Sequence, residues 1–237
     1  MRILITNDDG IEADGIRRLA EAAKAHGEVW VVAPDRQCSA MSHSINLQTP
    51  VTIRPHDFPV EGVSGFSCSG TPGDCVRLGS LNVMPEKPDV VFSGINYGYN
   101  VAGDIQYSAT VGAAMEAEFQ GLPAIAFSEG TNSAHEVTER YLAEIMAEMI
   151  EKPYVPGQIW NVNFPGCRLF ECQGILRDRK VSRIPFYKDH YNEAKHFPDG
   201  GVEYAVEGVH EVFEEEGTDY DAILKNYVTI GVVRNIS

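Results

Sequence analysis

The sequence predicts an α/β protein with a mostly parallel sheet and helices on both faces. First, short apolar runs alternate with helical patterns through the first two thirds of the chain. Second, runs such as Val29–Ala33 are apolar at every position, as in strands buried on both faces. Third, 237 residues suit one large α/β domain. We expect a single domain, with residues 1–177 as its core and residues 178–237 as a C-terminal extension.

The predicted elements alternate from the start of the chain. The strands are short, β-branched or apolar runs bounded by turn residues: Arg2–Thr6, Val29–Ala33, Ile45–Arg54, Gly65–Ser69, Asp89–Ser93, Ala124–Ser128 and Ile159–Asn163. The helices have apolar residues three or four apart, or start with a proline or a capping box: Ile11–Ala25, Pro72–Leu78, Ser108–Phe119, and a helix to Ile150 behind the capping box Ser133–Glu136.

The tail has a different character after Arg177. Arg183–Gly201 is polar and has no periodicity, whereas Val202–Val206 alternates like an exposed strand. Thr218 is placed to cap a short helix before a last strand at Tyr227–Val233. Because the tail has too few apolar residues for its own core, we expect an extended segment or hairpin that serves oligomerisation. It would pack on the main domain or be exchanged with another subunit.

Composition excludes several classes of partner. The net charge of −15 argues against a broad basic face for long nucleic acids. No apolar run approaches the roughly 18 residues of a membrane helix, and acids at positions 7–9 interrupt any signal-peptide pattern, so we expect a cytoplasmic protein. The five cysteines form no CxxC motif and are expected to be reduced thiols rather than zinc ligands.

Two adjacent acids, Asp8 and Asp9, directly follow the first strand. Ligands of an open parallel sheet bind beyond the carboxyl ends of its strands. The repulsion between side-by-side carboxylates is costly in free energy unless a cation lies near them, so the pair predicts a divalent metal site. The alternative is a simple turn with a helix N-cap, since Asn-Asp-Asp-Gly is also a turn sequence.

Two further polar residues follow predicted parallel strands. Ser39 lies in the loop after the second strand, and Asn96 follows the Asp89–Ser93 strand. With Asp8 and Asp9 they make an all-oxygen set that suits Mg²⁺ or Mn²⁺ better than Zn²⁺. The alternative is that Ser39 and Asn96 only hydrogen-bond loop backbone.

A third candidate is the small-residue start of the helix at Tyr107–Ala114. Its backbone N–H groups and the hydroxyls of Ser108 and Thr110 are suited to an anion such as phosphate. The alternative is an ordinary cap with close helix–sheet packing. Asp74 is expected to cap its own helix, and His43 to be solvated rather than to donate to a phosphate or leaving group.

The chain resembles a known family in six segments that follow one another in order. They are Asn7–Gly10, Ala33–Arg36, Ser39, Gly70–Pro72, Ser93–Asn100 and Tyr107–Val111. Together they resemble the SurE survival-protein family, and weaker similarity continues through Asn161–Pro165 and Gly217–Asp219.

The resemblance implies a function and a site. It implies a Rossmann-like core and a dimer or tetramer with exchanged C-terminal segments. The implied reaction is metal-dependent removal of phosphate from nucleoside 5′- and 3′-monophosphates. One divalent cation per subunit would be held by the four matching residues: Asp8, Asp9, Ser39 and Asn96.

Two alanines depart from the family pattern. Ala40 and Ala109 stand where the family usually has glycine. Alanine adopts positive φ with difficulty, so if those glycines use such angles, these loops must sit differently here.

These observations predict phosphomonoester hydrolysis at one Mg²⁺ or Mn²⁺ ion. Asp8 or Asp9 would take the proton of water, with Asp8 favoured. The phosphate would be bound by Gly98, Ser108 and Thr110, assisted by Asn100. The alternatives are a covalent aspartyl-phosphate route, a metal-dependent glycosyltransferase, and a non-catalytic module that binds nucleotides or senses metal.

Overall fold

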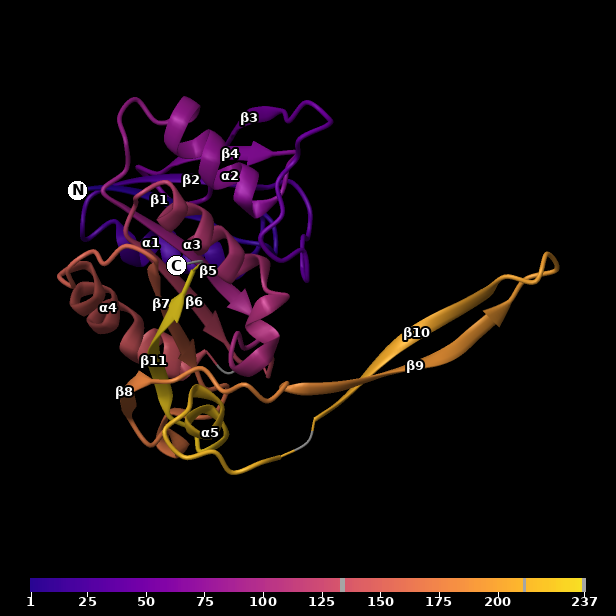
Figure 1. The fold of residues 1–237 in the computed structure, drawn as a ribbon. Coiled ribbons are helices and arrows are strands. Elements are labelled where there is room, and N and C mark those ends of the chain that lie inside the picture. The colour runs from indigo at the N-terminus through magenta and orange to yellow at the C-terminus, as the bar shows by residue number, and fades with distance from the viewer. Residues whose placement is uncertain (133–134, 211, 236–237) are drawn as a thin grey trace.

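A nine-stranded mixed sheet forms the centre of the molecule (Figure 1). The computed structural model describes residues 1–132, 135–210 and 212–235. The strand order is β3-β4-β2-β1-β5-β6-β7-β11-β8, and the six strands from β4 to β7 are parallel. The strands of this sheet are β1 (Arg2–Thr6), β2 (Glu28–Pro34), β3 (Ile53–His56), β4 (Ser64–Cys68), β5 (Val90–Tyr97), β6 (Ala124–Glu129), β7 (Gln158–Phe164), β8 (Ile175–Arg179) and β11 (Val228–Arg234).

Helices cover both faces of the sheet, as predicted. They are α1 (Asp14–Ala23), α2 (Pro72–Leu78), α3 (Ala109–Phe119), α4 (Glu136–Ile150) and α5 (Asp219–Leu224). β1 shows how two cores arise, because its successive side chains point to opposite faces. Ile3 and Ile5 belong to the core under α1 and α4, and Leu4 belongs to the core under α2 and α3. The mostly parallel α/β fold is therefore confirmed.

Three segments differ from the expectation. Within the predicted strand Ile45–Arg54, only the end joins β3, because residues 45–52 form a loop anchored from Asn46 to Asp74. β5 continues beyond Ser93 to Tyr97 after a shift in its pairing with β6, where Gly94 (φ 138) closely approaches the backbone of β6. β8 pairs with β11 at the sheet edge, although its alternation is too short to stand out in the sequence.

The beginning of α4 departs from the predicted capping box. Ser133 lies outside the described residues, and the helix begins at Glu136 with His135 as its N-cap residue. The predicted end at Ile150 is confirmed.

The tail contains a two-stranded hairpin that projects from the body (Figure 1). β9 (Tyr187–His196) pairs antiparallel with β10 (Val202–His210), and every residue of β9 is exposed. β9 falls in the segment that was expected to be nonperiodic. After the hairpin, α5 packs near the end of the main sheet and β11 inserts between β7 and β8.

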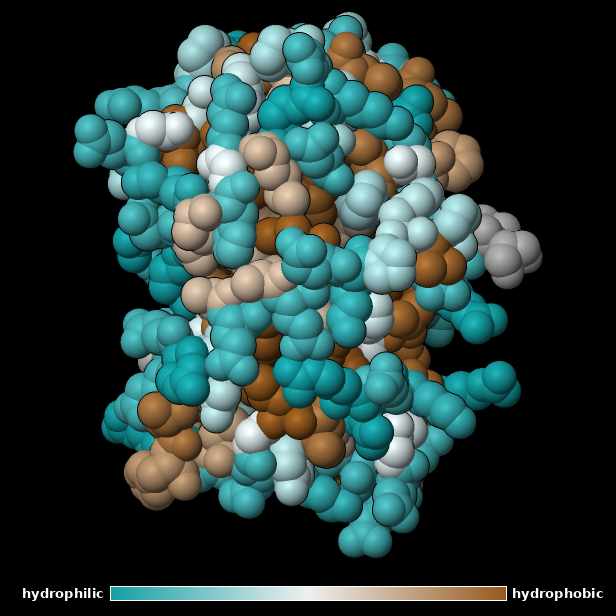
Figure 2. All heavy atoms as spheres, turned by 90° about the vertical axis from the view of Figure 1, so that its left-hand side faces the viewer, coloured by the Kyte–Doolittle hydropathy of each residue, from teal (hydrophilic) through white to brown (hydrophobic). Residues whose placement is uncertain are grey.

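One face of the molecule has a mostly hydrophilic surface. On the face drawn in Figure 2 hydrophilic residues predominate, and hydrophobic residues appear in scattered patches. In the described part of the chain, no helix combines the length and apolar character needed to cross a membrane. All five cysteines are free, and four are buried.

Candidate functional site

The carboxyl ends of β1, β2 and β5 bring the predicted metal ligands to one edge of the sheet. The backbone N–H of Cys38 donates to the Asp8 carbonyl at 2.7 Å, which places Ser39 beside the end of β1. The backbone N–H of Tyr97 donates to the Asp9 carboxylate at 3.0 Å, which places Asn96 beside the same acid. Contacts thus run from the Asp8–Asp9 pair to both loops.

Asp8 is a buried carboxylate at the first turn of α3. Its exposed fraction is 3%, and Thr110 Oγ1 donates to its Oδ1 at 2.6 Å. Burial raises the pKa of Asp8 to about 6, and the charge of Asp9 adds to the rise, whereas the Thr110 hydrogen bond opposes it. A cation at this place would stabilise the ionised form that burial disfavours.

Asp9 is less buried and is held by neighbouring donors. Burial raises its pKa, and hydrogen bonds from the Tyr97 backbone and the Gln37 side chain oppose the rise. Gln37 Nε2 also donates to Ser39 Oγ at 3.2 Å. Gln37 therefore links the second acid to the exposed serine.

Asn96 is oriented by its own loop. Its Nδ2 donates to the Gly98 carbonyl at 2.8 Å, which leaves Oδ1 as the oxygen available to a ligand. The free oxygens of the site are therefore carboxylate, hydroxyl and amide oxygens. This donor set fits a hard cation such as Mg²⁺ or Mn²⁺. Within the described ranges, no group of three or more His, Cys, Asp or Glu residues is placed to hold a metal ion.

The loop that carries Ser39 is fixed on α3. The backbone N–H of Ser42 donates to the Tyr107 carbonyl at 3.0 Å. His43 Nε2 lies 2.6 Å from Glu116 Oε2, and His43 stays exposed to solvent, as expected. Gly112 lets the loop approach this closely, because an added Cβ would lie 2.5 Å from the Ser42 carbonyl oxygen.

Asp74 anchors the far end of the same loop while capping its own helix. It completes a capping box with Thr71 at the start of α2, which confirms the predicted cap. Its carboxylate also accepts from the backbone N–H of Asn46 at 3.0 Å.

Ala40 takes the backbone conformation that alanine was expected to avoid. Its φ is 58°, in the left-handed region. Ala109 instead occupies the first position of α3. The loop therefore holds Ala40 in a strained, left-handed backbone conformation.

The four predicted phosphate ligands lie in the same region but make internal contacts. Ser108 caps α3 through its Oγ, and Thr110 Oγ1 is bound to Asp8. The Gly98 N–H donates to the Glu129 carbonyl at 2.8 Å. Asn100 is buried, and its Nδ2 donates to Ser128 Oγ at 2.8 Å. The helix α3 N-terminus, rather than free side chains, is what this region offers an anion.

Sequence reasoning missed a charged cluster next to Asp9. Glu129, at the end of β6, is buried, pairs with Arg18 and accepts from Thr138 Oγ1 at 2.7 Å. Its charge contributes to the raised pKa of Asp9. His135 Nδ1 lies 3.0 Å from the same carboxylate. The sequence contained no signal for the pairing, because Arg18 occupies an ordinary position in an amphipathic helix.

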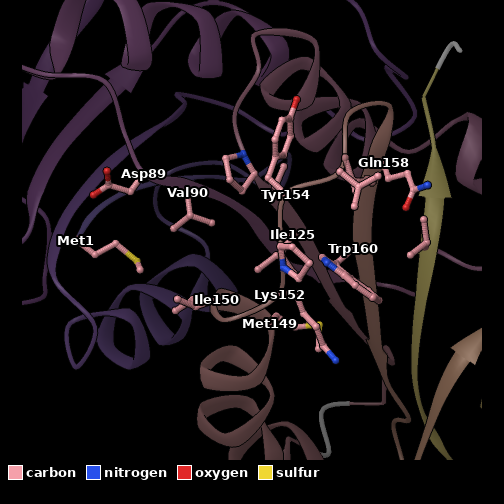
Figure 3. Close-up of a pocket in the computed structure, with 16 residues that line it drawn as sticks. Met1, Asp89, Val90, Ile125, Met149, Ile150, Lys152, Tyr154, Gln158 and Trp160 are labelled. Carbon is pink, nitrogen blue, oxygen red and sulfur yellow. The ribbon is translucent and has the colours of Figure 1, made fainter.

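A separate cavity opens at the opposite edge of the sheet (Figure 3). Its lining includes Asp89, before β5, and Trp160, on β7, with the Lys152 ammonium 5.9 Å from the Trp160 ring centre. At about 80 Å³ it is much smaller than the several hundred cubic ångströms of ordinary ligand pockets. The edge with the two aspartates is therefore the candidate site.

Comparison with known proteins identifies the family of the chain. The family model described as Survival protein SurE matches residues 3–184. Two relatives named 5′-nucleotidase SurE come from Thermosipho melanesiensis and Geobacter metallireducens. They are 37% and 39% identical to this chain, and each match covers 97% of this chain and 90% of the relative.

A solved structure supports the same relationship. The crystal structure of the SurE protein from Aquifex aeolicus superposes with a TM-score of 0.82 at 36% identity. The match covers 99% of this chain and 93% of that chain. The sequence match and the shared fold lead to one conclusion: the chain belongs to the SurE survival-protein family.

Proposed function

We propose that this protein is a metal-dependent 5′-nucleotidase that hydrolyses nucleoside 5′- and 3′-monophosphates to nucleosides and phosphate. The observation that carries the proposal is the convergence of the Asp8–Asp9 pair with the Ser39 and Asn96 loops. Membership of a family whose relatives are named 5′-nucleotidase SurE supports the reaction class. The cation is proposed to be Mg²⁺ or Mn²⁺, one per subunit, and the cytoplasmic location stays a prediction.

The residues of the site have separate proposed roles. When bound, the cation would neutralise charge on the phosphate oxygens. Asp8, Asp9, Ser39 and Asn96 would hold it through their oxygens. Asp8 is favoured as acceptor of the proton of water, since each aspartate needs only one of its two oxygens for the cation. The N-terminus of α3, with Ser108 and Thr110, and the Gly98–Asn100 loop would orient the phosphate.

The covalent route is less consistent with these contacts. An attacking carboxylate must approach phosphorus, whereas Asp8 accepts from Thr110 and Asp9 accepts from Tyr97. We therefore expect inversion of configuration at phosphorus with a substrate made chiral by oxygen isotopes, because direct attack by water is a single displacement. Net retention, the result of two successive displacements, would establish the covalent route instead.

Phosphate release from AMP separates the candidate functions. With Mn²⁺ we expect release that EDTA abolishes. A glycosyltransferase would bind a sugar nucleotide and leave AMP intact, and a sensing module would bind without turnover.

The sharpest variant is Asp9→Ala. We expect at least about a 100-fold loss of phosphate release, because a charged group that holds the cation is removed. Asp57→Ala, at an exposed acid outside the site, should retain activity. Retained turnover in a folded Asp9→Ala protein would refute the proposed site.

We also propose that the hairpin serves assembly into a dimer or tetramer. Tyr204 and Val206 on β10 are exposed apolar side chains on a ribbon that extends away from the core (Figure 1). Two-stranded ribbons are marginally stable alone, so a second subunit is a suitable partner.

A further inference from the structure

The loop between Ser39 and His43 has a strained backbone. Ala40 (φ 58°) and Ser42 (φ 53°) both adopt the left-handed region, although neither is a glycine. Such angles persist in non-glycine residues only where the surrounding contacts hold them in place. The conformation that brings Ser39 to the proposed metal site therefore depends on contacts made farther along the loop.

His43 anchors this loop to a buried acid of α3. Its Nε2 lies 2.6 Å from Oε2 of Glu116, a residue that is only 2% exposed. Burial raises the pKa of Glu116, but hydrogen bonds from His43 and Gln120 hold it below its usual value. Because an ionised carboxylate only accepts hydrogen bonds, His43 Nε2 carries a proton and donates it. The loop is thus anchored by a hydrogen bond to a charged group, which is stronger than one between neutral groups.

The helix and the loop are in close contact beside this hydrogen bond. A Cβ added at Gly112 would lie 2.8 Å from the backbone nitrogen of His43. Ser39 is only four residues from His43, so a shift of the loop at His43 would change the position of the Ser39 hydroxyl. The same carboxylate has a second charged partner on another element, because Arg77 of α2 donates to Glu116 Oε1 at 3.2 Å.

We propose that His43 is a positioning residue for the metal site, because through Glu116 it fixes the loop that brings Ser39 to the cation. The proposal rests on the proposed function, since the position of Ser39 matters only if the site holds the cation. His43 takes no part in the proposed chemistry at phosphorus. Its loss weakens cation binding, whereas the enzyme saturated with the cation still turns over.

Mn²⁺ binding measures this role without any turnover. The free Mn²⁺ in a titration followed by electron paramagnetic resonance gives the dissociation constant of the site. In His43→Ala we expect this constant to rise about tenfold, as is typical when a group that orients a metal ligand is removed. At saturating Mn²⁺, kcat for AMP should stay within about threefold of the wild-type value. His43→Gln, whose side-chain N–H can still donate to Glu116, should restore most of the affinity.

Arg77→Met is the matched control, because it removes a charged partner of the same carboxylate and leaves the loop anchor in place. Its Mn²⁺ dissociation constant should stay within about twofold of the wild-type value, even if urea unfolding shows that both variants lose stability. An unchanged constant in His43→Ala, or an equal rise in both variants, would overturn the positioning role. A wild-type protein that binds Mn²⁺ but releases no phosphate from AMP would instead overturn the proposed function.

Discussion

The Asp8 carboxylate makes the stability of the metal-free protein depend on pH. Its pKa rises from 3.8 to about 6 on folding, so the native state binds more protons than the unfolded chain between these values. The free energy of unfolding therefore falls as pH rises from 3.8 to about 6. It rises again when the pH is lowered through the same window. The group that serves the site destabilises the fold at neutral pH.

Asp8→Asn should stabilise the metal-free protein at pH 7. Asparagine can still accept from Thr110 but carries no charge, and a rise of this size corresponds to at most about 3 kcal/mol. We expect a gain of about 1–3 kcal/mol in urea unfolding with EDTA at pH 7, with phosphate release lost. The gain should shrink at pH 4.5, and an equal gain at both pH values would contradict this origin.

Ala40→Gly should also stabilise the protein. The φ of 58° costs alanine about 1–2 kcal/mol relative to glycine, part of which glycine loses again through its more flexible unfolded state. We expect a net gain of about 0.5–1 kcal/mol in thermal or urea unfolding. Ala109→Gly is the matched comparison, because glycine within the helix α3 should instead destabilise by a similar amount. A loss of stability in Ala40→Gly would show that the angle carries no strain.

At the scale of elements, α3 positions two parts of the site at once. Its first turn binds Asp8 through Thr110, and its Gly112 and Glu116 hold the loop that carries Ser39. A displacement of this loop from α3 would therefore change the proposed metal site without altering any predicted ligand.

Gly112→Ala tests this coupling. The new methyl group would lie 2.5 Å from the Ser42 carbonyl oxygen, so the loop must shift. We expect at least about a tenfold weaker activation by Mn²⁺, since displacements of about 1 Å from remote mutations have such effects. Ala113→Gly weakens the same helix without this clash and should keep the wild-type Mn²⁺ dependence. The same Mn²⁺ dependence in both variants would show that Gly112→Ala acts only by changing the stability of the protein.

Elements with a one-sided or fully apolar pattern were predictable, and exposed elements were not. β1, β2 and β6 are buried and read as apolar runs, and α2 begins with its proline and capping box. β9 contains Lys, Asp, His and Glu on both faces, so no period of two marks it. For the site, Asp8, Asp9 and Asn96 were predicted because ligands bind beyond the carboxyl ends of parallel strands. The Arg18–Glu129 pair was not predictable, because it depends on packing between elements distant in the sequence.

At the scale of the whole molecule, the projecting hairpin is the proposed interface between subunits. Val206→Glu places a charge on an exposed apolar position of β10. If the ribbon is a subunit interface, we expect a shift to smaller species in sedimentation velocity, because burial of an unpaired charge opposes association. Glu203→Lys, on the same strand, is the control for added charge. Unchanged assembly in Val206→Glu would locate the interface elsewhere.

β11 determines when folding can finish. It lies between β7 and β8, although more than 60 residues separate it from the end of β7. During synthesis from the N-terminus, β7 therefore keeps an open hydrogen-bonding edge until residues 228–234 emerge from the ribosome. Nascent chains stalled before that point would be prone to edge-to-edge aggregation and would depend on chaperones that shield exposed strands.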